Sequence, residues 1–376
     1  MRKKILLLII VVFGFIASAV LFTQFFRNTG KNILNSVNKV ANDDKGGLIN
    51  QLHPLAIESL RKGNYPGSDV VVEQTLDPGI NYLRYIVSYK SEGLKIYALL
   101  TVPNGPKPSN GWPVVIFNHG FIPPAEYRTT ERYIAYTDAF STNGYIVFRS
   151  DYRGHGNSEG RAAGGYGSND YTIDILNAVA SVKKLKDPTF HVISNEVRDP
   201  QGISPDGRND SSVIVDPNNI GMWGHSMGGF ITLRSMIVNK DIKAGVIWGG
   251  VVASYPDLLS RWQRRSTISP TPFPDSRGWR KRLVEQYGDP QKNPAFWNSI
   301  SANSFLKDIS GPIQLHHGTA DEEVPVEFSE KLFDEMKKAG KEVELYTYEG
   351  DDHNISGNLY TALQRSVEFF DKYLKQ

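Results

Sequence analysis

The chain has 376 residues, of which 22% are charged and 40% are hydrophobic, and its formal net charge is +2. These values are typical of a globular protein with one large α/β domain or two small ones, and so small a net charge favours no nucleic-acid partner. Cysteine is absent from the sequence, which excludes disulfide bonds, thiolate metal sites and a cysteine nucleophile. Since no residue spacing is typical of a metal site either, we expect neither a metal ion nor a cofactor.

The N-terminal segment predicts an attachment to the membrane. Three cations at residues 2–4 precede an uncharged, apolar run over residues 5–26, which is long enough to cross the core of a bilayer. Because flanking cations stay in the cytoplasm, we expect residues 1–27 to anchor a single-pass membrane protein whose folded domain is extracytoplasmic. The tripeptide Ala17-Ser18-Ala19 also resembles a signal-peptide cleavage site, so secretion after cleavage near Ala19 is the alternative.

Residues 28–68 are polar and mixed in composition, and they are predicted to form a stalk that contains one short helix over 53–63. Strand-like alternation of apolar and polar residues follows over 70–105, where Ser91-Glu92-Gly93 is typical of the turn of a hairpin. The folded domain is therefore expected to begin at about residue 69 with antiparallel strands.

Further along, short apolar strands alternate with amphipathic helices, and this alternation is typical of a doubly wound, mostly parallel sheet. We therefore expect residues 69–376 to form one α/β domain that includes a long surface loop over 187–216. The expected strands are 113–118, 145–150, 220–224, 244–252, 312–317 and 342–350, and the expected helices are 129–142, 170–185, 230–238, 326–339 and 358–374.

The residues between the strands 244–252 and 312–317 do not follow this alternation, and we expect residues 251–303 to form an inserted cap. The cap is rich in aromatic residues and in cations. Its cations form either a solvated basic face or a surface that attracts negatively charged substrates. The tryptophans of the cap are Trp262, Trp279 and Trp297, and its cations are Arg261, Arg264, Arg265, Arg277, Arg280, Lys281 and Arg282.

The sequence Gly224-His225-Ser226-Met227-Gly228 lies between a predicted strand and a predicted helix. In a nucleophile elbow, a serine occupies a tight, strained turn at such a junction, and small residues on either side leave room for it. Gly224, Gly228 and Gly229 stand where small residues are required. The helix that follows also directs its N-terminal N–H groups toward a developing anion. The pattern predicts that Ser226 is a nucleophile.

A serine hydroxyl is a weak nucleophile unless a base takes its proton. His353 is the expected base, because it follows the last predicted strand and precedes the last helix. An acid must then orient the imidazole, and Asp321, directly after the strand 312–317, is the expected one. The alternatives for the acid are Asp351, Asp352, Glu322 and Glu323, and the histidines expected to be structural are His119, His155, His225, His316 and His317.

Such a nucleophile also needs two hydrogen-bond donors for the oxyanion that forms on the substrate. We expect one to be the backbone N–H of Met227, the residue after the nucleophile. The other is expected from the loop after the strand 113–118. Phe121 N–H is the predicted donor there, since Pro123 and Pro124 have no N–H to give.

The order Ser226, Asp321, His353 along the chain is similar to that of the α/β-hydrolases, and the chain most resembles the catalytic domain of the prolyl oligopeptidase family. The resemblance implies an α/β-hydrolase fold and a serine peptidase that acts through an acyl-enzyme. It is carried by the motifs SEGLKIYALLTVPNG, DYRGHGNSEG, DPNNIGMWGHSMGGF, GTADEEVP and GDDHNI.

The chain departs from that family in two respects. Only about 50 residues separate the apolar segment from the first predicted strand, too few for the β-propeller that usually precedes the catalytic domain, and no acidic pair can be assigned to hold a substrate's amino terminus. Propeller-free relatives with a cap include the cinnamoyl and feruloyl esterases, whose HGF loop this chain resembles. A peptide or a small ester is therefore the expected substrate, either of a serine peptidase or of a carboxylesterase. A third hypothesis, an inactive hydrolase fold used for binding, predicts that a triad residue is missing.

Overall fold

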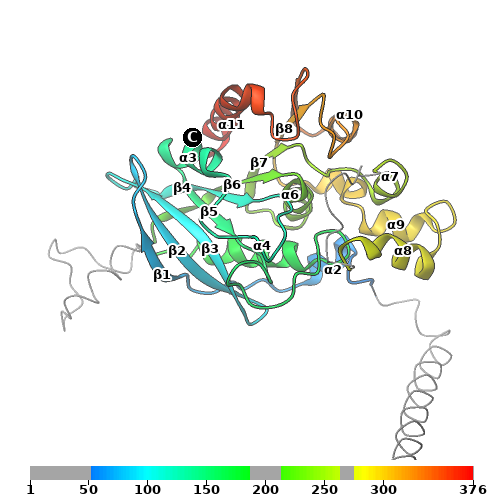
Figure 1. The fold of residues 1–376 in the computed structure, drawn as a ribbon, viewed down its shortest axis with the longest axis horizontal. Helices are drawn as coiled ribbons and strands as arrows, with labels where there is room; N and C mark the ends of the chain where they lie inside the picture. Colours follow the sequence, from blue (N-terminus) through cyan, green and yellow to red (C-terminus); the bar gives the residue numbers. More distant parts are fainter. Residues whose placement is uncertain (1–51, 187–212, 263–274, 376) are drawn as a thin grey trace, which may run out of the picture. The chain divides into compact units, whose positions relative to one another are not determined.

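The computed structural model describes residues 52–186, 213–262 and 275–375. Residues Pro54–Gln376 form one compact unit, and its centre is a twisted sheet of nine strands in the described part of the chain (Figure 1). The strand order is β1-β2-β3-β5-β4-β6-β7-β8-β9. Neighbouring strands that are not consecutive in sequence show that the chain crosses over between them, as expected of a doubly wound sheet.

Three antiparallel strands form one side of the sheet. They are β1 (Val71–Leu76), β2 (Tyr82–Ser91) and β3 (Leu94–Pro103). β2 and β3 pair from Tyr82 with Pro103 to Ser91 with Leu94, and Glu92 and Gly93 form the turn between them with positive φ angles of 49° and 82°. The predicted hairpin and its turn are confirmed.

The remaining strands are parallel to one another, and β5 also pairs antiparallel with β3. Their carboxyl ends therefore meet at one edge of the sheet, where ligands bind in folds of this kind. The predicted mostly parallel sheet is confirmed. These strands are β4 (Trp112–Asn118), β5 (Ile146–Ser150), β6 (Val215–His225), β7 (Ile242–Trp248), β8 (Ile313–Gly318) and β9 (Val343–Tyr348).

Helices cover both faces of the sheet, because alternate residues of each strand point to opposite faces. Val114 and Ile116 of β4 belong to one buried cluster, and Val115 and Phe117 belong to another. The first cluster contains residues of α4 (Asp170–Val182), α6 (Met227–Val238) and α10 (Glu327–Lys338), and the second contains residues of α3 (Ile134–Thr142) and α11 (Leu359–Leu374). Each fully buried large apolar side chain contributes about 1.5–3 kcal/mol to folding.

The predicted stalk is corrected at its C-terminal end. Helix α2 (Ile57–Lys62) lies on the compact unit, and Leu55, Ile57 and Leu60 are buried there. The buried guanidinium of Arg234 in α6 donates a hydrogen bond to the carbonyl oxygen of Leu55 (2.7 Å). The folded unit therefore begins at Pro54 rather than at residue 69.

The predicted membrane-spanning run, residues 5–26, lies outside the described residues. Over the ranges that the structure does describe, every helix is either too short or too polar to cross a bilayer.

The segment predicted as a cap connects β7 to β8 and is largely helical. It contains α7 (Tyr255–Ser260), α8 (Asp275–Tyr287), α9 (Pro294–Ile300) and a 3-10 helix η1 (Ala302–Asp308). Figure 1 shows α8 and α9, in yellow, on the side of the sheet away from β1, β2 and β3. Residues 263–274 of this segment lie outside the described residues.

Strand β7 ends at Trp248, earlier than the predicted 252. Gly249 has a φ of +49° and donates its N–H to the carbonyl oxygen of His316 (2.8 Å), which turns the chain out of the strand direction. A Cβ at position 249 would lie 3.0 Å from Nδ1 of His353. The turn therefore requires glycine and brings the start of the cap segment beside the predicted base.

Candidate active site

Ser226 forms a strained turn between β6 and α6, with φ of +54° and ψ of −117°. A residue other than glycine in such a conformation costs about 1–3 kcal/mol and persists only when its surroundings hold it. Here the Ser226 N–H donates to Trp248 O, and Ser226 O accepts from the N–H groups of Gly229 and Val251, each at 3.0 Å. The backbone on both sides of the serine is thus fixed by neighbouring elements.

The glycines around Ser226 are required by close backbone approach. A Cβ on Gly224 would lie 2.4 Å from Gly228 O, and a Cβ on Gly228 would lie 1.9 Å from Asn118 O. Both contacts are far shorter than any real Cβ contact, so each position excludes a side chain. The expectation that only small residues fit at 224 and 228 is confirmed.

His353 and Asp321 form a hydrogen-bonded pair. Nδ1 of His353 lies 2.7 Å from Oδ2 of Asp321, whose side chain is fully buried. Oδ1 of Asp321 accepts from the N–H groups of Glu323 (2.8 Å) and Val324 (2.9 Å). Burial alone would raise the pKa of Asp321, but hydrogen bonds from His317 and His353 outweigh it and hold that pKa below its usual value. The carboxylate is therefore ionised at neutral pH.

His317 is a second hydrogen-bond donor to Asp321, which sequence reasoning missed. Its Nε2 lies 3.1 Å from Oδ2 of Asp321 and 3.0 Å from Val324 O, and its Nδ1 lies 2.7 Å from Oγ of Ser329. Because both neighbours of Nε2 are acceptors, this nitrogen carries the proton. The signal in the sequence was the spacing of four residues between His317, at the end of a strand, and Asp321.

The alternative acids have other partners. Asp351 accepts hydrogen bonds from Gly357 N (2.8 Å) and Asn358 N (3.0 Å), and Asp352 accepts from Ser356 N (2.9 Å), so both carboxylates stabilise the turn before α11. Glu322 is exposed and Glu323 lines the cavity described below. The carboxylate that is hydrogen-bonded to His353 is that of Asp321, the residue chosen from the sequence.

The loops that carry Asp321 and His353 are in direct backbone contact. Ala320 N donates to Asp351 O (2.9 Å), and a Cβ on Gly318 would lie 2.3 Å from that same oxygen and 2.4 Å from Asp352 O. Gly318 is the last residue of β8, so the loop of Asp321 and the loop of His353 meet where that strand ends.

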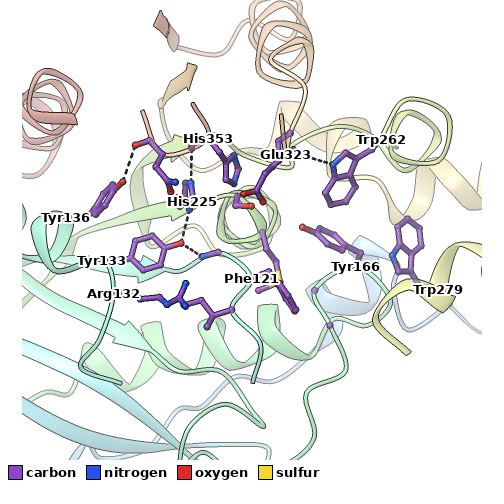
Figure 2. Close-up of a pocket in the computed structure, with 18 of the residues that line it drawn as sticks. Phe121, Arg132, Tyr133, Tyr136, Tyr166, His225, Trp262, Trp279, Glu323 and His353 are labelled. Carbon is purple, nitrogen blue, oxygen red and sulfur yellow. Dashed lines mark hydrogen bonds between the residues drawn. The ribbon is translucent and has the colours of Figure 1, made fainter. Parts of the chain in front are cut away.

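Ser226 and His353 line one cavity of about 500 Å³ (Figure 2). Within the described residues, the Ser226 hydroxyl makes no hydrogen bond to the His353 ring, and this contact often tightens only when substrate binds. The two predicted oxyanion donors line the same cavity. Met227 begins α6, so its N–H has no acceptor within the helix. The N–H of Gly120 already donates to the Tyr133 hydroxyl (3.0 Å), so it does not serve as the second oxyanion donor. Phe121 N–H is the next donor on the same loop.

One side of the cavity is joined by a chain of hydrogen bonds, and we call Gly120, Tyr133, His225 and His353 the hydrogen-bonded wall. The Tyr133 hydroxyl lies 2.8 Å from Nδ1 of His225, and Nε2 of His225 lies 3.0 Å from His353 O (Figure 2). A carbonyl can only accept, so Nε2 carries the proton and Nδ1 accepts from the tyrosine. Burial and the neighbouring His353 lower the pKa of His225 to about 3, which keeps this ring neutral.

Tyr133 is placed by a buried arginine of β5. The Arg149 guanidinium, only 1% exposed, donates to the carbonyl oxygens of Arg132 (2.8 Å), Glu131 (3.2 Å) and Thr129. Arg132 and Tyr133 both have positive φ angles, of 55° and 51°, so α3 begins at Ile134 instead of the predicted 129. Sequence reasoning missed Tyr133, because nothing in its neighbourhood signals this tertiary contact.

The opposite side of the cavity is aromatic and contains Tyr166, Trp262 and Trp279 (Figure 2). Arg280 lies against both tryptophan rings, and we call these four residues the aromatic wall. The ring of Tyr166 lies 5.2 Å from that of Trp262 and 6.3 Å from that of Trp279, between ring centres. Nε1 of Trp262 donates to Glu323 O (2.8 Å), which ties this wall to the loop of Asp321. Of the three tryptophans expected in the cap, Trp297 alone is fully buried away from the cavity lining.

The cap cations whose side chains the structure describes do not all lie in one kind of surroundings. Arg261 lies 3.8 Å from Asp257, and Lys281, which is exposed, lies 3.7 Å from Glu285. Arg280 instead lines the cavity, with its guanidinium carbon 5.3 Å from the ring centre of Trp262 and 5.4 Å from that of Trp279. Arg264 and Arg265 lie outside the described residues.

Comparison with known families agrees with this geometry. The sequence pattern of the prolyl oligopeptidase family matches residues 209–376, and that of the serine aminopeptidase family S33 matches residues 112–193. The first match contains all three predicted triad residues, and the second contains the loop of Phe121.

Two relatives come from Bacillus subtilis strain 168. The uncharacterized peptidase YuxL is 26% identical over 72% of this chain, and the uncharacterized peptidase YtmA is 24% identical over 72% of it. The chain spans 35% of the length of YuxL and 85% of the length of YtmA.

A solved structure of Est1E from Butyrivibrio proteoclasticus with ferulic acid bound shares the fold. The TM-score is 0.54 at 21% sequence identity, and the match covers 76% of this chain and 98% of that one. The strand order, the motifs and these matches lead to one assignment. The chain has the α/β-hydrolase fold, and its C-terminal part, residues 209–376, matches the prolyl oligopeptidase family.

Proposed function

We propose that the protein is a serine hydrolase with Ser226, His353 and Asp321 as its catalytic triad. The observation that carries the proposal is the strained Ser226, which lines the same cavity as a histidine already paired with a buried carboxylate. Strain of this kind is concentrated at functional sites. A hydrolase fold used only for binding would not need it, and no predicted triad residue is missing from the sequence.

In the proposed reaction, Ser226 attacks the substrate carbonyl while Nε2 of His353 takes its proton. The bond from Nδ1 of His353 to Asp321 (2.7 Å) holds the ring in the tautomer that leaves Nε2 free to accept. Because the pKa of Asp321 lies below its usual value, the carboxylate stays charged and stabilises the imidazolium. His353 then protonates the leaving group, and water cleaves the acyl-enzyme by the same steps.

The oxyanion of each tetrahedral intermediate is proposed to receive hydrogen bonds from the backbone N–H groups of Phe121 and Met227. Donors of this kind act most strongly where charge develops in a site that excludes water, and losing one typically lowers kcat about 10²–10³-fold. Both residues line the cavity beside Ser226.

A peptide is the proposed substrate, because the prolyl oligopeptidase pattern covers the triad residues and both Bacillus relatives are named peptidases. A carboxylesterase is the second candidate. It is favoured by the aromatic wall, which offers a surface for an aryl or acyl group, and by the shared fold with Est1E, a structure solved with ferulic acid bound, of which the match covers 98%.

We further propose that residues 1–27 anchor the protein in a membrane with the hydrolase outside, and that cleavage near Ala19 followed by secretion is the alternative. The apolar run and its cationic flank support this location. N-terminal sequencing of the protein recovered from membranes and from the medium distinguishes the two outcomes.

The decisive experiment compares purified full-length protein with its Ser226→Ala variant. We expect kcat on short-chain p-nitrophenyl esters to fall by roughly 10⁶-fold in the variant, with an almost unchanged Tm, since one hydroxyl is removed from a cavity surface. Activity above background in the variant would exclude Ser226 as nucleophile. Peptide p-nitroanilides, assayed beside the esters, then separate the two candidates: cleavage that requires Ser226 indicates a peptidase, and ester turnover alone indicates an esterase.

A further inference from the structure

Arg280 differs from the other described cations of the cap in its surroundings. Its guanidinium lies against the rings of Trp262 and Trp279 and lines the same cavity as Ser226. The side chain is only partly exposed, and it has no ion pair with any carboxylate in the described part of the chain. Burial accordingly lowers the pKa of Arg280, and only the nearby Tyr166 opposes this effect.

Such an arrangement has an unmet electrostatic requirement. Partial burial of a charged group is unfavourable unless an opposite charge or hydrogen bonds compensate it. The two tryptophan faces attract the cation, but they do not accept hydrogen bonds from its N–H groups as a carboxylate would. A ligand that brings a carboxylate into the cavity would complete the partners of Arg280.

The neighbouring cations show that the requirement is local. Arg261 and Lys281 are paired with Asp257 and Glu285 from their own helices or helix ends, and neither lines the cavity. Within the described ranges, the charged residues that line it are Arg132, Arg280 and Glu323, two cations and one anion. Glu323 lies between His353 and Trp262 (Figure 2).

We propose that Arg280 and the tryptophans beside it form a subsite for a carboxylate carried by the substrate. This inference rests on the proposed hydrolase function and deepens it, because it assigns the substrate class: a peptide or ester with an apolar segment and a carboxylate near the scissile bond. The aromatic faces contact the apolar segment, and the guanidinium donates two parallel hydrogen bonds to the carboxylate, the geometry that arginine favours.

The carboxylate can come from the acyl side or from the leaving group, and two pairs of ester substrates distinguish them. On the acyl side, mono-p-nitrophenyl adipate is compared with its isosteric terminal amide. On the leaving-group side, 4-acetoxybenzoate is compared with 4-acetoxybenzamide. Activated esters suit both candidate functions, since peptidases and esterases of this type form the same acyl-enzyme.

In one of the two pairs we expect the wild-type protein to favour the acid over the amide by about 10- to 100-fold in kcat/KM. This is the size of effect expected when a substrate gains hydrogen bonds to a charged group. Arg280→Gln should remove this preference, because turnover of the acid should fall much further than turnover of the amide. Arg280→Lys, which retains the charge without the planar fork, should retain part of it. Lys281→Gln and Arg261→Gln are the matched controls and should retain all of it.

A binding measurement makes the test independent of turnover. In the Ser226→Ala background, intrinsic tryptophan fluorescence is titrated with adipamate, which has one carboxylate, and with the neutral adipamide. We expect only adipamate to change the signal, with an affinity that falls as salt is added and a response that is lost in the Ser226→Ala, Arg280→Gln double variant. Tm values confirm that each variant is folded.

Three outcomes overturn the proposal: a wild type that prefers the amides, a wild type without preference in either pair, or an Arg280→Gln variant that loses acid and amide activity equally. The last would make Arg280 a packing residue of the aromatic wall. If Ser226→Ala retained turnover, the proposed nucleophile would fail, and the fluorescence titration would still decide whether Arg280 binds the carboxylate.

Discussion

The two walls of the cavity are built on different principles. In the hydrogen-bonded wall, each described polar contact has a defined donor and acceptor, and the chain from Gly120 N–H through Tyr133 and His225 ends at His353 O. The aromatic wall is held mainly by ring contacts, and its one cation, Arg280, stacks on rings. Hydrogen bonds are directional and hold side chains in one geometry, as the positioning of reacting groups requires. Ring contacts tolerate adjustment, which suits recognition of a substrate.

The largest effect in this comparison is expected at Asp321. The variant Asp321→Asn should lower kcat by about 10⁴-fold, because an amide cannot hold the same tautomer of His353 or stabilise the positive charge of its ring. Steady-state kinetics on a p-nitrophenyl ester measures it. Asp352→Asn is the matched control, since that carboxylate stabilises a turn beside His353. Equal losses in the two variants would refute the assignment of the acid.

A smaller effect is expected at Tyr133. Tyr133→Phe removes the donor to His225 and the acceptor for Gly120 N–H at once, and an unsatisfied buried group costs about 1–3 kcal/mol. We expect kcat to fall roughly 10- to 100-fold with KM little changed, because the loop of Phe121 loses its position without losing contact with bound substrate.

Tyr136→Phe provides the comparison for Tyr133, as the Tyr136 hydroxyl donates to Asn354 O (3.1 Å) and has no bond to His225 or Gly120 among the described residues. A kcat for Tyr133→Phe that matches the kcat for Tyr136→Phe would mean that the hydrogen-bonded wall does not position the reacting groups. If Tyr133→Phe raised KM without lowering kcat, Tyr133 would instead have a role in substrate recognition.

The smallest expected effect concerns the free energy of unfolding and its dependence on pH. In the hydrogen-bonded wall, this dependence comes from His225. The pKa of His225 is about 3 in the folded protein against an ordinary value of 6.5, so the unfolded chain binds a proton first as the pH falls. The stability due to neutral His225 is therefore complete above pH 6.5 and is lost as the pH falls toward 3. Burial acts in the same direction on His155 and His316, whose pKa values are about 4 and about 3.

Urea unfolding at pH 7 and pH 5 measures this loss. We expect the free energy of unfolding to decrease at the lower pH, and to decrease less in His225→Gln, which cannot bind the proton. Trp262→Phe, from the aromatic wall, should retain the wild-type difference. If His225→Gln also retained it, the neutral state of His225 would not contribute to the pH dependence.

The residues whose positions in the fold the sequence indicated are those with a local signal. Ser226 is enclosed by glycines that backbone contacts require, and Asp321 and His353 follow apolar strands whose ends meet at one edge of the sheet. The parallel strands themselves were recognisable as short apolar runs, because both of their faces are buried. Their pairing order then brought the predicted residues together.

The elements that the sequence did not reveal depend on contacts between distant segments. Tyr133 is set by Arg149 from another strand, and α2 joins the core through the bond from Arg234 to Leu55 O. Arg280 could not be separated from the neighbouring cations of the cap, because only the orientation of α8 places it on the rings of Trp262 and Trp279. No pattern of residue types along the chain records these tertiary contacts.

The close approach at Gly318 constrains how this site can diverge. Since the loop of Asp321 and the loop of His353 touch through Asp351 O, any side chain at 318, or any inserted residue in one loop, would separate Asp321 from His353 unless the other loop changed with it. The two loops can therefore be exchanged between related proteins only as a pair. The aromatic wall meets the loop of Asp321 through the side-chain hydrogen bond from Trp262 to Glu323 O, so its other residues can vary in sequence while Asp321 and His353 stay in contact.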